Sequence, residues 1–128
     1  MHKFLTLFIF VLFLIGCGTT GETHIQQNEL LTQIKTAQAP VIVDVRSESE
    51  YKTGHIQGAI HIPFWQAFST DKLEKYHHTE IIVLYCQHGP RAGIAKLALS
   101  MAGFENIRYL KGHMSGWIQS KLPITINN

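Results

Sequence analysis

Apolar residues along the chain fall into two kinds of run, short continuous ones and longer periodic ones. The segments 41–45 (VIVDV) and 81–85 (IIVLY) are short and rich in β-branched or aromatic residues, which is typical of strands buried on both faces of a sheet. The segments 28–38 and 90–102 carry apolar residues three and four positions apart, which is the spacing of a helix face. The alternation of these runs predicts an α/β fold with a mainly parallel sheet.

Weaker patterns complete the alternation. Short strands are expected at 24–25, 59–62 and 107–110, and short or broken helices at 47–52, 64–76 and 113–120. The helix at 90–102 is expected to gather Ile94, Leu97, Ala98 and Met101 on its apolar face. Ligands of such sheets bind beyond the carboxyl ends of the strands. Asp44 and Cys86, which stand at the ends of the two buried strands, therefore mark the candidate site.

The N-terminal residues follow a different pattern. A short basic start precedes a nearly continuous apolar run from Phe4 to Ile15. That run is shorter than the roughly 20 residues of a membrane-spanning helix and fits the apolar region of a secretory signal peptide. It ends in Leu-Ile-Gly-Cys at 14–17, which resembles the lipobox of bacterial lipoproteins. In that family the peptide is cut before the cysteine, and the cysteine is lipidated.

This interpretation divides the chain into a lipoprotein signal peptide at 1–16, a lipidated Cys17 with a short tether at 17–23, and one domain at 24–128. The lipid would anchor the protein to a bacterial membrane, on the periplasmic face. Gly18 follows the cysteine where inner-membrane lipoproteins carry aspartate, which favours the outer membrane. An ordinary signal peptide or a short anchor helix is the alternative.

Composition narrows the classes of function. The eleven basic and nine acidic residues give a net charge of +2, and the basic residues are scattered, so the electrostatic signature of a nucleic-acid-binding protein is missing. The chain has two cysteines. If lipid occupies Cys17, Cys86 has no partner for an internal disulfide. A lone thiol in an oxidising compartment is a liability unless its chemistry is used; an inert core cysteine is the alternative.

Cys86 opens a six-residue loop between a buried strand and a helix. The loop consists of Cys86, Gln87, His88, Gly89, Pro90 and Arg91. Gly89 permits a turn that a side chain would block, and Pro90 suits the first helical position. The loop can then direct N–H groups at the sulfur, and together with the helix dipole they favour a nucleophilic thiolate. Arg91 is expected to offer a fixed cation to an anionic substrate.

Other polar residues are expected to support this site. Asp44 should accept hydrogen bonds from loop N–H groups, and Arg46 could pair with Glu50 four residues later. His55 is expected to fix its own loop, and the side chain of His88 to face outward. Phe64 and Trp65 are expected to fill the core. The pair His77-His78 has no surrounding cluster of metal ligands, so we expect a solvated surface there and predict no metal.

Three motifs, in this order, resemble the rhodanese family. They are Asp44-Val45-Arg46 with 54–63 (GHIQGAIHIP), the loop 86–91, and the closing segment 103–117 with its Gly112 and Trp117. The resemblance covers about residues 24–122 and implies a three-layer fold with helices on both faces of the sheet. It also implies a monomeric sulfurtransferase in which the cysteine takes sulfur from a small donor such as thiosulfate and passes it to cyanide or a thiol, without a cofactor.

Two other functions stay open at this point. Cysteine-dependent phosphatases and arsenate reductases also use an amide-lined loop, but theirs has five residues between cysteine and arginine, and this chain has four. A non-catalytic rhodanese-like binding module is the other alternative, although such members typically lack the cysteine. One departure concerns the closing segment, where the family usually has two glycines and this chain has Gly112-His113. His113 either lines the pocket or faces solvent.

Overall fold

The computed structural model describes residues 22–127, which form a five-stranded parallel sheet between helices. The strands are β1 (His24–Ile25), β2 (Val41–Asp44), β3 (Ile60–His61), β4 (Ile81–Tyr85) and β5 (Asn106–Leu110). Their spatial order is β1-β5-β4-β2-β3, and every neighbouring pair is parallel. The predicted α/β fold is thereby confirmed.

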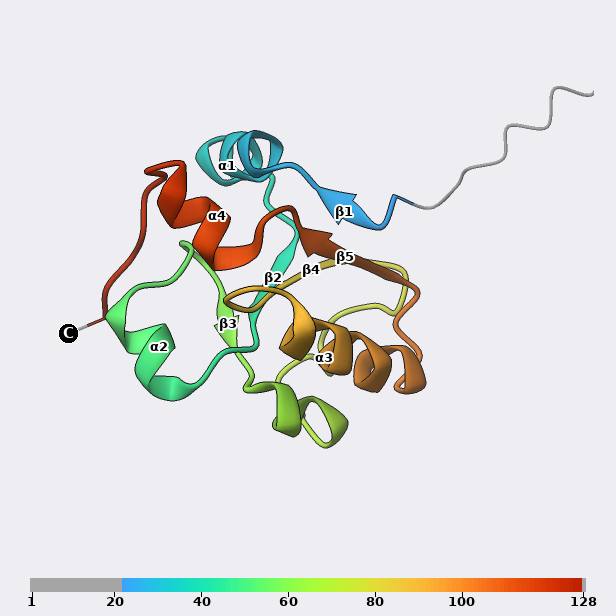
Figure 1. Ribbon diagram of the computed structural model, residues 1–128. Coiled ribbons are helices and arrows are strands. Elements are labelled where there is room, and N and C mark those ends of the chain that lie inside the picture. Colours follow the sequence, from blue (N-terminus) through green and yellow to red (C-terminus); the bar gives the residue numbers. More distant parts are fainter. Residues whose placement is uncertain (1–21, 128) are drawn as a thin grey trace, which may run out of the picture.

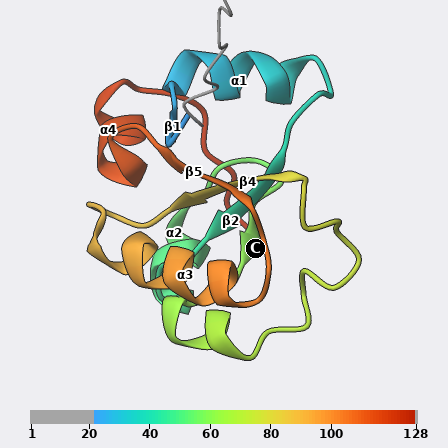
Figure 2. The ribbon, with the colours of Figure 1, turned by 90° about the vertical axis from the view of Figure 1, so that its right-hand side faces the viewer.

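Helices cover both faces of this sheet, which makes three layers. The helices α1 (Gln27–Lys35) and α4 (His113–Gln119) lie on one face. The helix α3 (Pro90–Met101) and the 3-10 helix η1 (Phe64–Phe68) lie on the other, as Figures 1 and 2 show from two sides. The short helix α2 (Glu48–Thr53) lies at the β3 side of the sheet (Figure 1).

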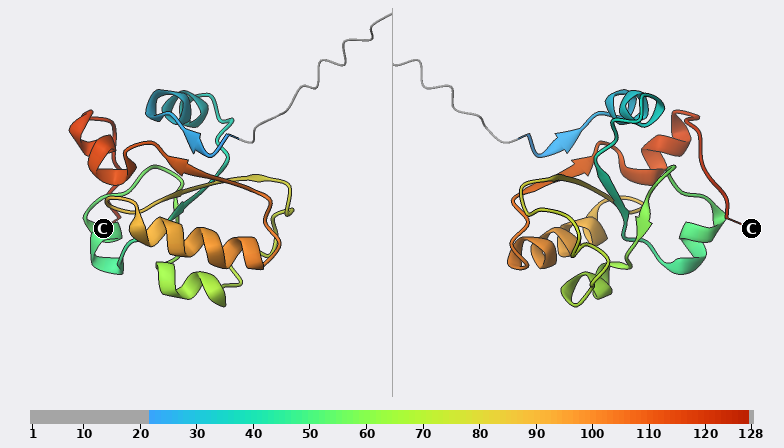
Figure 3. Two further views of the ribbon diagram at one scale, coloured as in Figure 1. Left: turned by 45° about the vertical axis from the view of Figure 1, so that its right-hand side comes forward. Right: turned by 180° about the vertical axis from the view of Figure 1, so that it is seen from behind.

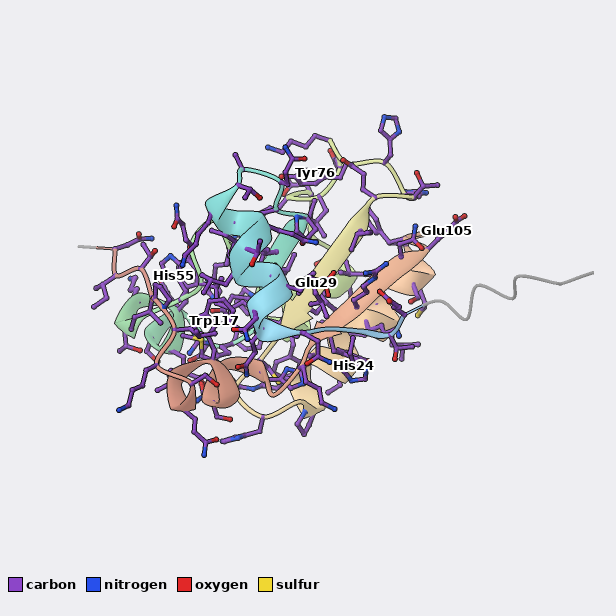
Figure 4. All side chains as sticks on the ribbon, turned by 90° about the horizontal axis from the view of Figure 1, so that it is seen from above. His24, Glu29, His55, Tyr76, Glu105 and Trp117 are labelled. Atoms are coloured by element: carbon purple, nitrogen blue, oxygen red, sulfur yellow. The ribbon has the colours of Figure 1, made fainter. Side chains whose placement is uncertain are left out.

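Strand residues are buried alternately on the two faces, because both are covered. Toward α3 and η1 the core contains Val43, Ile82, Leu84, Ala95 and Leu99. Toward α1 and α4 it contains Ile42, Val83, Leu30, Met114 and Trp117. Figure 4 shows α1, with Glu29, lying across the sheet, and Trp117 of α4 is buried on the same side of the sheet. The indole N–H of Trp117 donates to the carbonyl of Pro123 at 2.9 Å, so the chain after α4 is fixed to the same core.

The inner face of α3 differs from the expected one. It is made of Ala92, Ala95, Ala98 and Leu99. Ile94, Leu97 and Met101 are instead 43%, 59% and 74% exposed, so the expected apolar face was wrong at three of its four positions. The physical reason is close packing on two sides, since α3 lies against both the sheet and η1 (Figure 3). Alanine side chains let the helix approach both neighbours, whereas larger ones would hold it away.

Other expected boundaries also change. The helix expected at 64–76 is only the five-residue η1, followed by turns, and Trp65 on it is 54% exposed rather than in the core. The first helix ends at Lys35, since Ala37 adopts a left-handed φ of 56° that a helix cannot continue through.

The expected signal peptide and Cys17 lie outside the described residues. Between residues 22 and 127, none of the helices has the length and apolar content needed to cross a membrane.

The two leucines of α3 test which face of the helix is buried. Leu99→Ala should lower the free energy of unfolding by about 2–5 kcal/mol, because Leu99 is 2% exposed and its truncation leaves a cavity. Leu97→Ala is the matched control in the same helix and should change the free energy of unfolding by less than about 0.5 kcal/mol. Urea denaturation measures both. A larger loss for Leu97→Ala would contradict the inner face described above.

Candidate active site around Cys86

The candidate site lies where β2 and β4 end side by side. The parallel register pairs Asp44 with Tyr85, so the next residues, Val45 and Cys86, leave the sheet together at its carboxyl edge. Cys86 is a free thiol and is 1% exposed. The structure therefore brings Asp44 and Cys86 to one edge of the sheet, as the strand pattern predicted.

The loop 86–91 curls around the sulfur of Cys86. Gly89 takes a φ of 133°, in the region that favours glycine, and Pro90 is the first residue of α3. The N–H of Gly89 donates to Cys86 Sγ at 2.9 Å. The N–H groups of His88 and Ala92 also contribute to stabilising the charge of this sulfur. The structure thus contains the cradle of N–H groups that the loop sequence predicted.

This cradle changes the acidity of the thiol. Burial by itself raises the pKa of Cys86, since it disfavours the charged form. Hydrogen bonds from the side chain of His113 and from the N–H groups of Ala92, Gly89 and His88 outweigh burial and lower the pKa to about 7. About half of the sulfur is therefore thiolate at neutral pH, and the thiolate is the nucleophilic form.

The first turn of α4 holds the loop in place. The N–H of Met114 donates to the carbonyl of Cys86 at 3.0 Å. The N–H and the hydroxyl of Ser115 donate to the carbonyl of Gln87 at 3.1 and 3.0 Å. The His88 side chain is exposed, as expected, and its Nδ1 lies 3.1 Å from the Ser115 hydroxyl. With its carbonyls occupied in this way, the loop is free to turn its N–H groups inward.

Asp44 and Arg46 form a buried ion pair beside the loop. Their side chains are 0% and 3% exposed, and Arg46 Nη2 lies 2.7 Å from Asp44 Oδ2. Asp44 also accepts the N–H of Arg46 at 2.9 Å. The guanidinium of Arg46 donates further to the carbonyl of Gly54 at 2.7 Å and to Gln87 Oε1 at 3.2 Å. Burial by itself lowers the pKa of Arg46, but the hydrogen bond and charge of Asp44 raise it by more. The pair therefore stays charged, and it connects three loops.

The expected pair of Arg46 with Glu50 is wrong. Arg46 precedes Ser47, the N-cap of α2, so it does not lie on that helix and cannot pair along it. Glu50 instead binds the guanidinium of Arg91, with Oε1–Nη1 and Oε2–Nη2 distances of 2.6 and 2.9 Å. Arg91 is therefore fixed, as we expected, but it already has a carboxylate partner. Its charge is compensated by Glu50, and the pair fastens the first turn of α3 to α2.

His113 lies in the site, which the sequence left open. The N–H of Cys86 donates to His113 Nδ1 at 3.2 Å. On the other side of the ring, a Cβ added to Gly89 would lie 3.3 Å from His113 Nε2. His113 adopts a φ of 53°, which is unusual for a residue other than glycine. The departure from the family's paired glycines was the one signal in the sequence that pointed to this residue.

The remaining candidates lie away from the sulfur. His55 is buried, and its ring stacks on Tyr51 with ring centroids 3.8 Å apart. His55 Nδ1 also lies 2.9 Å from the backbone carbonyl of Tyr51. His55 thus fixes the loop after α2 beside the C-terminal segment (Figure 4). His77 and His78 are exposed. Within residues 22–127, no three His, Cys, Asp or Glu side chains gather closely enough to hold a metal ion.

Two described cavities lie outside the loop. One, of about 430 Å³, opens at the amino-terminal end of the sheet, where Val41, Ile81 and Arg108 line it. Another, of about 170 Å³, lies between η1 and the C-terminal half of α3. We place the chemistry at Cys86 instead, because the groups that stabilise a thiolate converge there. The site is a cradle around one buried sulfur rather than a wide pocket.

Comparison with known proteins shows which family the chain resembles. Residues 26–120 match the family of the rhodanese-like domain. The thiosulfate:glutathione sulfurtransferase of Saccharomyces cerevisiae is 34% identical over 89 residues, which are 61% of this chain and 64% of the yeast protein. The thiosulfate sulfurtransferase GlpE of Glaesserella parasuis is 32% identical over 87 residues, covering 67% of this chain and 78% of that protein.

Solved structures agree with the sequence comparison. The crystal structure of a rhodanese-related protein from Thermoplasma volcanium superposes with a TM-score of 0.67 at 28% identity, covering 81% of this chain and 98% of that one. The solution structure of the rhodanese-like domain of an Anabaena protein gives a TM-score of 0.71 at 26% identity, covering 83% and 80%. The aligned parts thus include most of the described domain.

The Glu50–Arg91 pair makes a prediction for acid stability. The hydrogen bond from Arg91 lowers the pKa of Glu50 to about 2, below its unfolded value of about 4.3. The stabilisation is therefore complete above about pH 4.5 and is lost as the pH falls toward 2. Glu50→Gln keeps the capping box with Ser47 and should cost about 1 kcal/mol at pH 7, since the pair is about one third exposed.

The free energy of unfolding, measured from pH 7 down to pH 2.5, tests this prediction. The difference between wild type and Glu50→Gln should shrink below about pH 4.5. Glu48→Gln is the control on the same helix, because the Glu48–Lys52 pair is exposed and should contribute less. A difference that stays constant over the whole range would show that the charge of Glu50 does not act through Arg91.

Proposed function

The chain belongs to the rhodanese-like domain family, and on that premise we propose that it is a sulfurtransferase that carries sulfur as a persulfide on Cys86. The observation that supports this function best is the cradle of N–H groups around a thiol whose pKa is lowered to about 7. Such a sulfur is a nucleophile at neutral pH. The cradle can also accept the negative charge of a second sulfur.

The first step forms the persulfide. The Cys86 thiolate attacks the sulfane sulfur of thiosulfate, so that a bond from Sγ to this sulfur forms. The bond between the two sulfur atoms of thiosulfate breaks, and its electron pair leaves with sulfite. The product on the protein is a persulfide anion, and the total charge is unchanged. The N–H groups of His88, Gly89 and Ala92 that bond to Sγ would stabilise this product.

The second step returns the thiolate. Cyanide or an acceptor thiolate attacks the outer sulfur of the persulfide, and a new carbon–sulfur or sulfur–sulfur bond forms. The bond between Sγ and the outer sulfur breaks, and its electron pair returns to Sγ. The names of the yeast and Glaesserella relatives contain thiosulfate, and the yeast name also contains glutathione. We therefore propose small sulfane-sulfur donors and thiol acceptors as the substrates to examine first.

Phosphoryl transfer is supported less well. A phosphatase loop uses its arginine to bind the equatorial oxygens of the phosphoryl group. In this chain the loop is one residue shorter than in phosphatases, and the guanidinium of Arg91 already binds both carboxylate oxygens of Glu50. A loop of this size suits a single sulfur atom better than a phosphoryl group.

Cys86→Ser should abolish sulfur transfer and leave the fold intact, because a serine hydroxyl stays protonated near neutral pH and forms no persulfide. Thiosulfate:cyanide activity is measured beside a phosphate-ester assay, and mass spectrometry follows the addition of one sulfur to Cys86. Activity that persists in a folded Cys86→Ser protein would exclude this mechanism. A wild-type protein that gains no sulfur and transfers none would favour a binding module.

We also propose, from the sequence, that lipid on Cys17 anchors the protein to the periplasmic face of a bacterial membrane, with the outer membrane preferred. The support is the order of a basic start, an apolar run and Leu-Ile-Gly-Cys at 14–17. Several acyl chains on one residue suffice for stable anchoring. The sulfurtransferase domain would then work as a monomer close to the bilayer.

Cys17→Ser should release the protein from membranes or leave the N-terminal peptide uncleaved, since no acyl chain could be attached. Cells that express each form are fractionated, and the mature N-terminus is identified by mass spectrometry. Cys86→Ser serves as the matched control, because it removes a thiol without touching the anchor. A Cys17→Ser protein that is cleaved and still bound to membranes would refute the lipid anchor.

A further inference from the structure

We propose that His113 is a hydrogen-bond donor, through Nε2, toward the sulfur of Cys86, first toward the thiolate and then toward the outer sulfur of the persulfide. The part that concerns the persulfide rests on the sulfurtransferase function proposed above. The part that concerns the thiolate does not, and it can be tested without any sulfur donor.

The backbone of Cys86 determines which nitrogen of His113 carries the proton. The Cys86 N–H donates to His113 Nδ1 at 3.2 Å. A ring nitrogen that accepts a hydrogen bond carries no proton, so in the neutral ring the proton is on Nε2. Protonation of Nδ1 would set two N–H groups against each other and break this contact. The arrangement therefore leaves Nε2 as the donor of the ring.

That donor lies next to Gly89 of the loop. The space beside Gly89, where a Cβ would be, lies 3.3 Å from His113 Nε2. The N–H of Gly89 in turn donates to Cys86 Sγ at 2.9 Å. The His113 ring thus lies beside the residue whose N–H bonds to the sulfur, and it comes from another element of the chain. A hydrogen bond from the His113 side chain is also among the causes that lower the pKa of Cys86.

The backbone at His113 is consistent with a functional role. His113 has a φ of 53° and follows Gly112, whose φ is 78°. A residue other than glycine is strained in this backbone region, and residues held in strained conformations cluster at functional sites. Here the strain places the ring between the Cys86 N–H and Gly89. A glycine at this position would relieve the strain and lose both contacts.

Other charged or titratable groups near His113 are already engaged. The ring of Tyr109, from β5, lies 6.1 Å from the His113 ring. Lys96 Nζ, from α3, lies 4.9 Å from the centre of the Tyr109 ring, and the centre of the His24 ring lies 5.5 Å from that of Tyr109. His88 bonds to Ser115. On the α2 side, Arg91 is paired with Glu50. Among these groups, His113 is the one whose ring accepts the backbone N–H of Cys86.

A side-chain donor suits a persulfide for a geometric reason. In the persulfide the negative charge moves to the outer sulfur, about 2 Å from Sγ. The backbone N–H groups of the loop are directed at Sγ, so they stabilise this charge less well than that of the thiolate. His113 comes from α4 and not from the loop, and we place its Nε2 donor on the outer sulfur while Nδ1 keeps the Cys86 N–H.

The test is the pH dependence of Cys86 alkylation by iodoacetamide in the full chain, followed by mass spectrometry on the peptide that contains Cys86. In wild type the rate should rise with a midpoint near pH 7. In His113→Gly and His113→Asn the midpoint should rise by about one unit, toward the ~8.5 of a free thiol. The rate at pH 6 should then fall about tenfold, with little change above pH 10.

The three variants separate the possible causes. Asparagine tolerates the left-handed backbone and still accepts the Cys86 N–H, but it is too short to bring a donor to the sulfur. His113→Gln extends an uncharged amide N–H to about the depth of Nε2, so its midpoint should stay closer to wild type. Glycine removes both contacts and should fold at least as stably, which melting temperatures will check.

Several outcomes would overturn the proposal. An unchanged midpoint in the glycine and asparagine variants, even with a faster plateau, would mean that His113 only covers the thiol. A glutamine variant that behaves like glycine would mean that a cationic ring is required. After thiosulfate treatment, the persulfide should decay several-fold faster in His113→Asn than in wild type. If wild type forms no persulfide, the proposed function fails, while the alkylation profile still decides the role of His113 toward the thiolate.

Discussion

A sulfur anion in a buried position has to be stabilised by hydrogen-bond donors, and this requirement shapes the whole site. Cys86 is 1% exposed, and burial alone would keep it protonated. The side chain of His113 reverses that effect together with the N–H groups of the loop. These N–H groups can point at one atom only because Gly89 takes a φ of 133° and a helix begins directly after it. The conformation of the loop therefore determines the acidity of the thiol.

The loop keeps this conformation because it is fastened on three sides. The start of α4 occupies the carbonyls of Cys86 and Gln87. The buried Asp44–Arg46 pair reaches the Gln87 side chain, and Glu50 holds Arg91. Both arginines of the site are thus used for structure, with their charges compensated by carboxylates. The field at the sulfur then comes mainly from uncharged donors, and such donors change little when the sulfur shifts between thiolate and persulfide.

Local sequence patterns predicted the sheet and the position of the nucleophile. The β-branched runs before Asp44 and Cys86 required buried parallel strands, and the Gly89-Pro90 pair required a turn followed by a helix start. These inferences succeeded because strand burial, glycine turns and proline at the first helical position depend on residues close together in the chain. For the same reason Asp44 could be placed near Cys86, since neighbouring parallel strands end at the same edge.

Contacts between residues far apart in the chain were decided by the tertiary structure alone. The sequence determined that Cys86 ends a buried strand and begins a loop that favours a thiolate. It did not determine which residue Arg91 binds, because Glu50 lies 41 positions away and its partner depends on how α2 packs. Which residues of α3 face the core was decided by the close approach of η1, which admits alanine side chains, and not by which residues of the helix are most apolar. The ring of His113, 27 positions from Cys86, accepts the Cys86 N–H because β5 and α4 pack beside β4, and only the packing of these elements could decide that.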